Sequence, residues 1–421
     1  MHRVAARILT LLLGTLLCVL VLGTGVSHAE GETLRGTLRN EGEPVTGVSM
    51  SAEGPDGFSG DAESGADGTW EIPVPGPGAY TVSIDEDSLP EGVALRIADR
   101  TSVETTVATG QAKTVLFALG EGTRQTTGTA GQALQLTVEG IRFGLILALG
   151  AVGLSLIYGT TGLTNFAHGE LITLGALVAY LFNVPFNIPL IPAAFLTLIV
   201  CGLAAGLQDL VLWRRLRRRG TGLIAMMIVS IGLSLLVRYF YLYLFGGANR
   251  SFGDYAGQAG LAFGPVSLTP KDIVAMVVAV VMLLLVGFAL LRTRIGKATR
   301  AVSDNPALAS ASGIDVERVI QVVWVAGGVL AGLSGILLAL SQQVSFQLGF
   351  QVLLLVFAAV TLGGLGTAFG ALAGSMVVGL FINLSTLIIP SELKNVGALG
   401  ILIVILLVRP QGLLGRAERV G

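Results

Sequence analysis

The residues best placed to do chemistry lie in a short polar stretch between two long apolar runs. Residues 159–170 combine glycines and threonines with two ionisable side chains, His168 and Glu170. Ionisable groups within membrane-spanning sequence are costly and mark pathways or gates by default. Irregular backbone at that depth is tolerated only where protein covers it or where it lines a wet cavity. Our pathway or gate candidates are Thr161, Thr164, Asn165, His168, Glu170, Gln342, Gln343 and Asn383. The alternative is a plain cytoplasmic turn whose Asn165 and Glu170 cap the next helix.

A second polar stretch, residues 292–318, interrupts the apolar second half of the chain. Its charged residues are Arg292, Arg294, Lys297, Arg300, Asp304, Asp315, Glu317 and Arg318. Each charge costs about 2.5–3.5 kcal/mol at the centre of a bilayer, so this segment lies outside the membrane, and its basic start places it in the cytoplasm. Within it, residues 305–312 are predicted to form a short helix with Asp304 or Asn305 as N-cap, Pro306 in the first turn and Gly313 as its stop. Such a helix suits docking onto another protein, although an ordinary connecting loop is the alternative.

Composition bounds the class of protein. The chain has 421 residues, of which 52% are hydrophobic and 13% charged, with a formal net charge of −1. This predicts a multi-span membrane protein, and the balanced charge excludes a nucleic-acid footprint. The two cysteines, Cys18 and Cys201, lie in apolar runs without metal-ligand spacing. We therefore expect no metal and no other cofactor.

The N-terminal quarter differs from the rest. Residues 1–29 have the basic start, apolar middle and small-x-small end of a signal peptide, with an uncleaved anchor as the alternative. Residues 30–125 are acidic and rich in turn residues, and alternating stretches predict an exported all-β sandwich. The expected strands are 33–38, 46–52, 69–74, 79–84 and 114–119, and a linker follows at 126–133. The sequences around Asp67-Gly68-Thr69-Trp70 and Gly78-Ala79-Tyr80 resemble carboxypeptidase regulatory-like domains, which implies no catalysis.

The remaining apolar runs predict an α-helical membrane domain over residues 134–415. They are 134–158, 170–182, 188–213, 222–245, 272–291, 319–340, 350–365, 370–389 and 396–408. Nine spans place the arginine cluster 214–219, the 292–318 loop and the C-terminus in the cytoplasm and the N-terminal domain outside, as the distribution of Lys and Arg requires. The second and last runs are short for a span and are candidates for broken or tilted helices.

Four motifs in order resemble the branched-chain amino-acid permease family of ABC importers, of the high-affinity leucine/isoleucine/valine type. Residues 153–170 match its G-L-x-L-I-Y-G-x-x-G-x-x-N-F-A-H-G-E signature. Gly296, Arg300, Ala301, Asn305, Ala309, Gly313 and Ile314 match the pattern of its cytoplasmic loop. Residues 362–370 resemble its glycine-rich turn and residues 408–415 its C-terminal ending. The resemblance does not cover residues 30–125.

The resemblance implies a non-enzymatic transport subunit in the plasma membrane of a bacterium. Its implied partners are a second permease of the same type, two cytoplasmic ATP-binding subunits, an extracytoplasmic solute-binding protein and the lipid bilayer. The chain itself has no Walker A sequence. The residues expected to couple to the ATPase are Gly296, Arg300, Asn305, Pro306, Ala309, Gly313 and Ile314. Urea or short amides are the alternative substrates. An ion-coupled secondary transporter and a sensor or anchor are the alternative classes.

Overall fold

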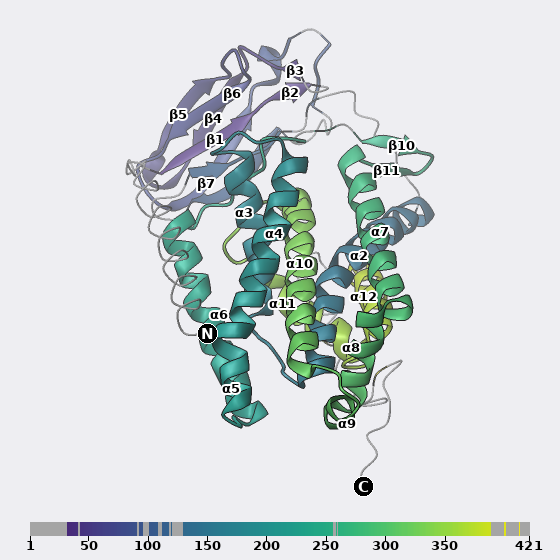
Figure 1. Ribbon diagram of the computed structural model, residues 1–421. Coiled ribbons are helices and arrows are strands. Elements are labelled where there is room, and N and C mark those ends of the chain that lie inside the picture. Colours follow the sequence, from purple (N-terminus) through teal and green to yellow (C-terminus); the bar gives the residue numbers. More distant parts are fainter. Residues whose placement is uncertain are drawn as a thin grey trace. The chain divides into compact units, whose positions relative to one another are not determined.

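The computed structural model divides the chain into two compact units, residues 1–124 and residues 125–421, which we call the strand unit and the helical unit (Figure 1). The structure describes residues 32–388 apart from 41–42, 91, 96–100, 108–111, 118, 120–128, 256–257 and 259, and it also describes residues 400 and 412. The predicted signal peptide and most of the predicted C-terminal span and ending lie outside the described residues.

The strand unit holds two main sheets around one hydrophobic core. Its elements are β1 (Thr33–Thr37), β2 (Arg39–Asn40), β3 (Glu43–Pro44), β4 (Ser49–Glu53), η1 (Pro55–Gly57), β5 (Ser59–Glu63), β6 (Thr69–Pro73), β7 (Gly78–Ile84), η2 (Glu86–Ser88), β8 (Ser102–Val107) and β9 (Ala112–Thr114). One sheet has the order β6-β1-β9, with β9 parallel to β1, and the other has the order β5-β4-β7-β8. Alternate residues of the strands, such as Met50, Ile72 and Val82, point into the shared core.

The sequence located the strands with apolar alternation and missed the others. Strands were predicted near β1, β4, β6 and β7, and all four are present. The expected strand over 114–119 is wrong, since β9 ends at Thr114. β5 and β8 were not predicted because their exposed faces carry short polar and acidic residues, and cross-strand pairing with β4 and β7 holds them in place. Trp70 and Tyr80 are buried, as expected for core residues.

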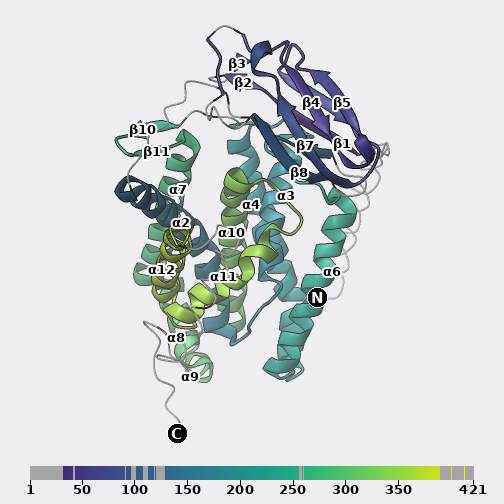
Figure 2. The same cartoon turned by 180° about the vertical axis from the view of Figure 1, so that it is seen from behind.

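The helical unit contains long apolar helices with shorter elements between them (Figure 2). They are α2 (Thr129–Thr161), α3 (His168–Asn183), α4 (Leu190–Gln208), the π-helical turn η3 (Asp209–Trp213), α5 (Arg214–Arg218), α6 (Leu223–Phe245), the hairpin β10 (Leu261–Phe263) and β11 (Val266–Leu268), α7 (Pro270–Arg292), α8 (Arg294–Asp304), α9 (Pro306–Ala311), α10 (Val316–Gln342), α11 (Leu348–Gly363) and α12 (Ala368–Ser385). Among the described residues, six helices are long and apolar enough to cross a membrane.

Two further predicted spans within the described residues form helices that are shorter than these six. The runs 170–182 and 350–365 form α3 and α11, which have 16 residues each. Sixteen residues reach about 24 Å, short of the roughly 30 Å of a hydrocarbon core. Both are shorter than the six long helices, in keeping with a broken or tilted helix for the run 170–182, and the nine-span count stays a prediction.

Glycines let the central helices cross at backbone distance. α10 packs against α2, α3 and α4. A Cβ atom built on Gly153 of α2 would lie 2.9 Å from the carbonyl oxygen of Gly327 of α10, and a Cβ on Gly327 would lie 3.1 Å from that of Gly153. Helices in lipid gain little from hydrophobic burial against one another, so close backbone packing stabilises their association. The glycine-rich stretches therefore act as packing surfaces.

Candidate functional site

The polar stretch after α2 turns back into the bundle. α2 ends at Thr161, and Gly162 follows in the left-handed region with φ of 68°. His168, the first residue of α3, places its Nε2 atom 2.9 Å from the carbonyl oxygen of Gly150. Gly150 lies eleven residues before the end of α2, which corresponds to about 16 Å along the helix. α3 thus begins beside the middle of α2.

The chain makes a matching return after α10. Gln343 follows the helix with φ of 85°, and the backbone of Val344 pairs with that of Arg250 beyond the end of α6. α11 then begins at Leu348, within the bundle. The amide nitrogen of Gly349 donates to Thr173 Oγ1 of α3 at 3.0 Å, and a Cβ on Gly349 would overlap the carbonyl oxygen of Gly169. The first turns of α3 and α11 therefore meet, and we call this meeting point the half-helix junction.

The structure brings three of the pathway or gate candidates together at this junction. Asn165, His168 and Glu170 are buried there. Asn165 Oδ1 accepts a hydrogen bond from the Ala167 amide at 3.1 Å and shapes the turn before α3. Thr161 donates to the carbonyl of Ile157 within α2, and Thr164 belongs to the returning segment.

The other candidates lie elsewhere. Gln342 is exposed at the end of α10, and Gln343 is the turn residue after it. Asn383 lies on α12 and donates to the carbonyl of Gly379 in its own helix at 3.0 Å. These side chains are not part of the junction, and a pathway role for them remains a prediction.

Sequence reasoning missed the partner of Glu170. Glu170 Oε1 accepts hydrogen bonds from Arg238 Nη2 at 2.9 Å and from Ser234 Oγ at 2.9 Å, and both donors belong to α6. Tyr241, also on α6, donates to the Glu170 carbonyl at 3.1 Å. On its other side, the Arg238 guanidinium lies 3.6 Å from the centre of the Phe350 ring of α11. The signal was present, because a lone arginine within the apolar run 222–245 requires a counter-charge.

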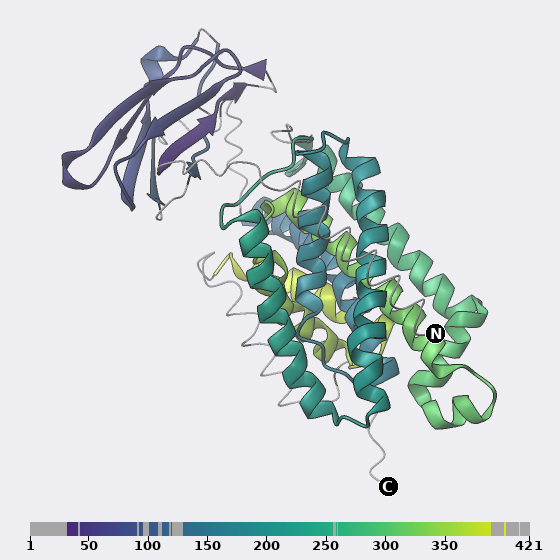
Figure 3. The same ribbon diagram turned by 60° about the vertical axis from the view of Figure 1, so that its left-hand side comes forward.

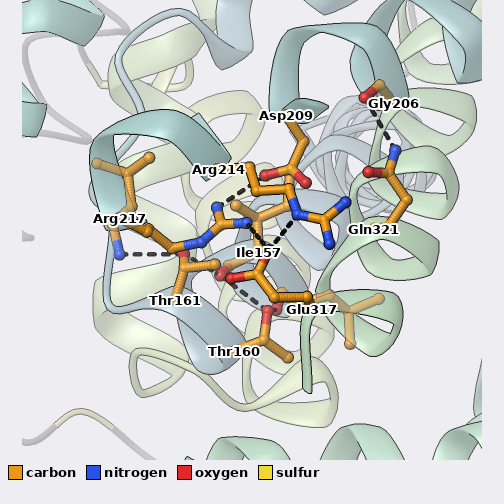
Figure 4. A network of polar contacts seen from close by, with 11 residues as sticks. Ile157, Thr160, Thr161, Gly206, Asp209, Arg214, Arg217, Glu317 and Gln321 are labelled. Atoms are coloured by element: carbon orange, nitrogen blue, oxygen red, sulfur yellow. Dashed lines mark hydrogen bonds and ion pairs between the residues drawn. The ribbon is translucent and has the colours of Figure 1, made fainter. Parts of the chain in front are cut away.

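A second polar network joins the end of α4 to the start of α10 (Figure 4). Arg217 of α5 lies between Asp209 Oδ1, at 2.7 Å, and Glu317 Oε2, at 3.3 Å. Arg214 Nε reaches the same Glu317 oxygen at 2.9 Å, and Gln321 Nε2 donates to the Gly206 carbonyl at 2.9 Å. The π-helical turn η3 places Asp209 inward, where its side chain has no exposed surface. Glu317 lies in the first turn of α10, three residues after the 305–314 segment, so the network anchors the base of that segment.

We expect Arg217→Ala to destabilise the helical unit strongly. The substitution leaves the Asp209 carboxylate buried without its cation, which typically costs about 3–5 kcal/mol. The melting temperature of the purified protein in detergent should fall clearly below that of the parent. The double variant Asp209→Asn/Arg217→Gln removes both charges and should recover much of the loss. Equal melting temperatures for Arg217→Ala and the parent would contradict the anchoring role.

The polar stretch 292–318 forms two helices at the end of the helical unit that also carries α5 (Figures 1 and 3). The predicted short helix is confirmed as α9, with Pro306 in its first turn. Asn305 is the N-cap, since its Oδ1 accepts from the Leu308 amide at 3.0 Å, and Gly313 ends the segment with φ of 89°. The preceding amphipathic helix α8 was not predicted, because charged residues dominate its sequence.

The expected coupling residues divide between two sides of α8 and α9. Gly296 and Ala309 are buried, and Ala309 packs with Val302 and Val319. Ile314 packs against the same small cluster. Arg300, Asn305 and Pro306 are exposed, as are Gly313 and the unpredicted Leu308, of which 68% is exposed. One side of this loop therefore holds it to α10, and the other side is exposed in the part of the chain that the structure describes.

The chain is similar in sequence to proteins of one transport family. The family described as "Branched-chain amino acid transport system / permease component" matches residues 136–407. The chain is 30% identical over 297 residues to the high-affinity branched-chain amino acid transport system permease protein LivH of Escherichia coli K12, covering 68% of this chain and 96% of that protein. It is 30% identical over 299 residues to BraD of Pseudomonas aeruginosa, with the same coverage. It is 32% identical over 297 residues to a probable LivH of Methanocaldococcus jannaschii, covering 67% of this chain and 92% of that protein.

No solved structure matches the chain. The matched region contains the half-helix junction, the α8–α9 loop and the long apolar helices except for the first turns of α2, whereas the strand unit lies before it. The chain is thus a multi-pass membrane transport subunit rather than an enzyme, and it belongs to the permease family of branched-chain amino-acid transport systems.

Proposed function

We propose that this chain is the permease subunit of an ATP-driven importer of branched-chain amino acids. The observation that carries the proposal is the family match over residues 136–407, which includes both the half-helix junction and the capped, exposed helix α9. A permease of this class needs a path through the bilayer and a surface that receives motion from an ATPase. The two features supply a candidate for each.

The proposed assembly has two permease subunits, two cytoplasmic ATP-binding subunits and an extracytoplasmic solute-binding protein. α9 docks on an ATP-binding subunit, so α5, α8 and α9 face the cytoplasm and the β10–β11 hairpin faces outward. Arginines support this orientation, because five of them occupy positions 214, 215 and 217–219 at the α5 end. The C-terminus would also lie in the cytoplasm.

Alternating access would act through the half-helix junction. Closure of the ATPase dimer moves α9, and the Arg217 network and α10 carry that motion toward the first turns of α3 and α11. Asn165 and His168 shape the returning segment, and Glu170 joins it to α6. Thr161, Thr164, Gln342 and Asn383 remain proposed pathway residues on α2, the returning segment, α10 and α12.

The strand unit is proposed to be an exported sandwich that follows a signal peptide and docks the solute-binding protein. Its two sheets share one core, and the unit lies outside the region that the relatives match. Deleting residues 30–125 should raise the concentration of solute-binding protein that is needed for half-maximal uptake. Unchanged apparent affinity and maximal rate would rule this role out.

The importer function is tested by co-purifying the chain with its genomic neighbours and reconstituting the complex in vesicles. ATP-dependent accumulation of leucine, isoleucine and valine is expected, with urea left outside. Uptake of urea or a short amide in place of these amino acids would assign the alternative substrate class. Accumulation by the chain alone, driven by an ion gradient, would overturn the ABC assignment.

A further inference from the structure

The ion pair at the half-helix junction leaves one oxygen unused. Glu170 Oε1 takes all three side-chain donors, which are Ser234 Oγ and Arg238 Nε and Nη2. Glu170 Oε2 is buried and has no hydrogen-bond partner among the described residues. A buried carboxylate oxygen without a donor is expensive. Asp209 Oδ2 in the Arg217 network is also buried without a partner, so the case for a ligand at Glu170 rests on the surroundings of the pair as well.

The surroundings of the pair suit a small charged ligand. The partly positive N-terminal ends of two 16-residue helices, α3 and α11, meet beside it. Among the described residues, the side chains of Arg238 and Glu170 are 11% and 3% exposed, so both act in a poorly hydrated environment. The Phe350 ring covers the guanidinium and is itself 44% exposed. Phe350 therefore separates the ion pair from the surface of the helical unit.

Apolar side chains continue along the same face of α11. Phe350 and Phe357 are seven residues apart, which places them on one side of the helix. The Phe357 ring lies 4.9 Å from that of Phe166, a residue of the returning segment before α3. One charged pair and a row of aromatic rings thus occur side by side. The charged pair would suit the ammonium and carboxylate groups of an amino acid, and the aromatic row would suit an aliphatic side chain.

We propose that Glu170 and Arg238 form a transit subsite for zwitterionic amino acids. When Phe350 moves aside, the carboxylate of the solute binds Arg238 and its ammonium group binds Glu170 Oε2. The exchange replaces one ion pair by two, which offsets the cost of bringing both solute charges into a region of low dielectric. An uncharged amide carries no ionic groups that Arg238 and Glu170 would neutralise. The proposal rests on the proposed function and narrows its substrate to the zwitterion.

The test uses the reconstituted complex and the double variant Glu170→Gln/Arg238→Gln. Removing both charges avoids an uncompensated buried ion, so the complex should assemble. We expect leucine uptake to fall at least about tenfold, because the solute charges then cross without partners. ATP hydrolysis stimulated by the leucine-loaded binding protein should stay within about twofold of the parent, since α9 and the Arg217 network are unchanged.

The matched control is Arg142→Gln/Asp272→Asn, which neutralises an ion pair away from the junction, at 2.5 Å between α2 and α7. Near-parental leucine uptake is expected for it. Should the junction variant fail to assemble, Arg238→Lys decides the question, because lysine keeps the charge but lacks the two-pronged geometry that binds a carboxylate. This variant should lose at least about fivefold in uptake with stimulated ATP hydrolysis retained.

The outcomes separate this inference from the importer function. A parent complex that takes up none of the three amino acids refutes the proposed function itself. A parent complex that imports leucine, together with a junction variant that imports it within about twofold of the parent, refutes the transit subsite alone. The subsite is also refuted if Arg238→Lys transports normally, or if uptake and stimulated ATP hydrolysis fall together in whichever variant assembles.

Discussion

Replacing Gly335 by leucine should remove most of the folded permease from the membrane. Gly335 lies on α10, and a Cβ atom there would overlap the carbonyl oxygen of Ile172 on α3. The atom in the way belongs to backbone, so no side-chain rotation relieves the clash, and separating α3 from α10 would also open the half-helix junction. Overpacking of a core costs about 1–3 kcal/mol even where neighbours can shift, and we expect at least the upper end. Fluorescence-detected size exclusion in detergent should show a loss of about tenfold or more in monodisperse protein.

Gly232→Leu is the matched control for this prediction. Gly232 is also a glycine within an apolar helix, α6, but among the described residues no atom outside its own helical turn and chain neighbours lies within 4 Å of the position that its Cβ would occupy. Its yield should equal that of the parent or rise slightly, since glycine disfavours a helix by about 1 kcal/mol. Equal losses for the two variants would mean that general sensitivity of glycine positions, rather than the α3–α10 contact, explains the result.

The pattern of apolar residues predicted the helices of the membrane unit because burial and length leave few alternatives. It also placed α9, since Asn305, Pro306 and Gly313 each have a local conformational role that does not depend on distant residues. The run of α3 was recognised as unusually short for a span, whereas the run of α11 was not. Their meeting could not be predicted, because it depends on how two loops more than a hundred residues apart return into the bundle.

The partners of Glu170 illustrate the same limit. The sequence marks Glu170 as a candidate by its type and its apolar context. Arg238 lies 68 residues later on another helix, and only the packing of α6 against α3 brings the two charges to 2.9 Å. The Arg217 network has a similar origin, since the π-helical turn η3 shifts the positions that face α10. A helix of regular period, assumed from the sequence, would direct these side chains elsewhere.

Leu308→Asp should abolish coupling without harming the fold. Leu308 is 68% exposed on α9, so its side chain contributes little to the core of this subunit. In the proposed assembly it enters a groove of the ATP-binding subunit, where a buried, unpaired carboxylate costs several kcal/mol. We expect the melting temperature of the isolated permease to stay unchanged and co-purification of the ATP-binding subunit to fail. ATP-driven leucine uptake should then drop by about tenfold or more.

Lys297→Asp provides the comparison, because it introduces the same side chain at an exposed position of α8, the helix before α9. It should retain the ATP-binding subunit and most of the uptake, since α8 precedes the proposed docking helix and its exposed side carries mainly charged residues. Normal uptake by Leu308→Asp would show that α9 does not dock on the ATPase. Loss of the partner in both variants would instead place the contact over the whole of residues 292–318, with α8 as part of the docking surface.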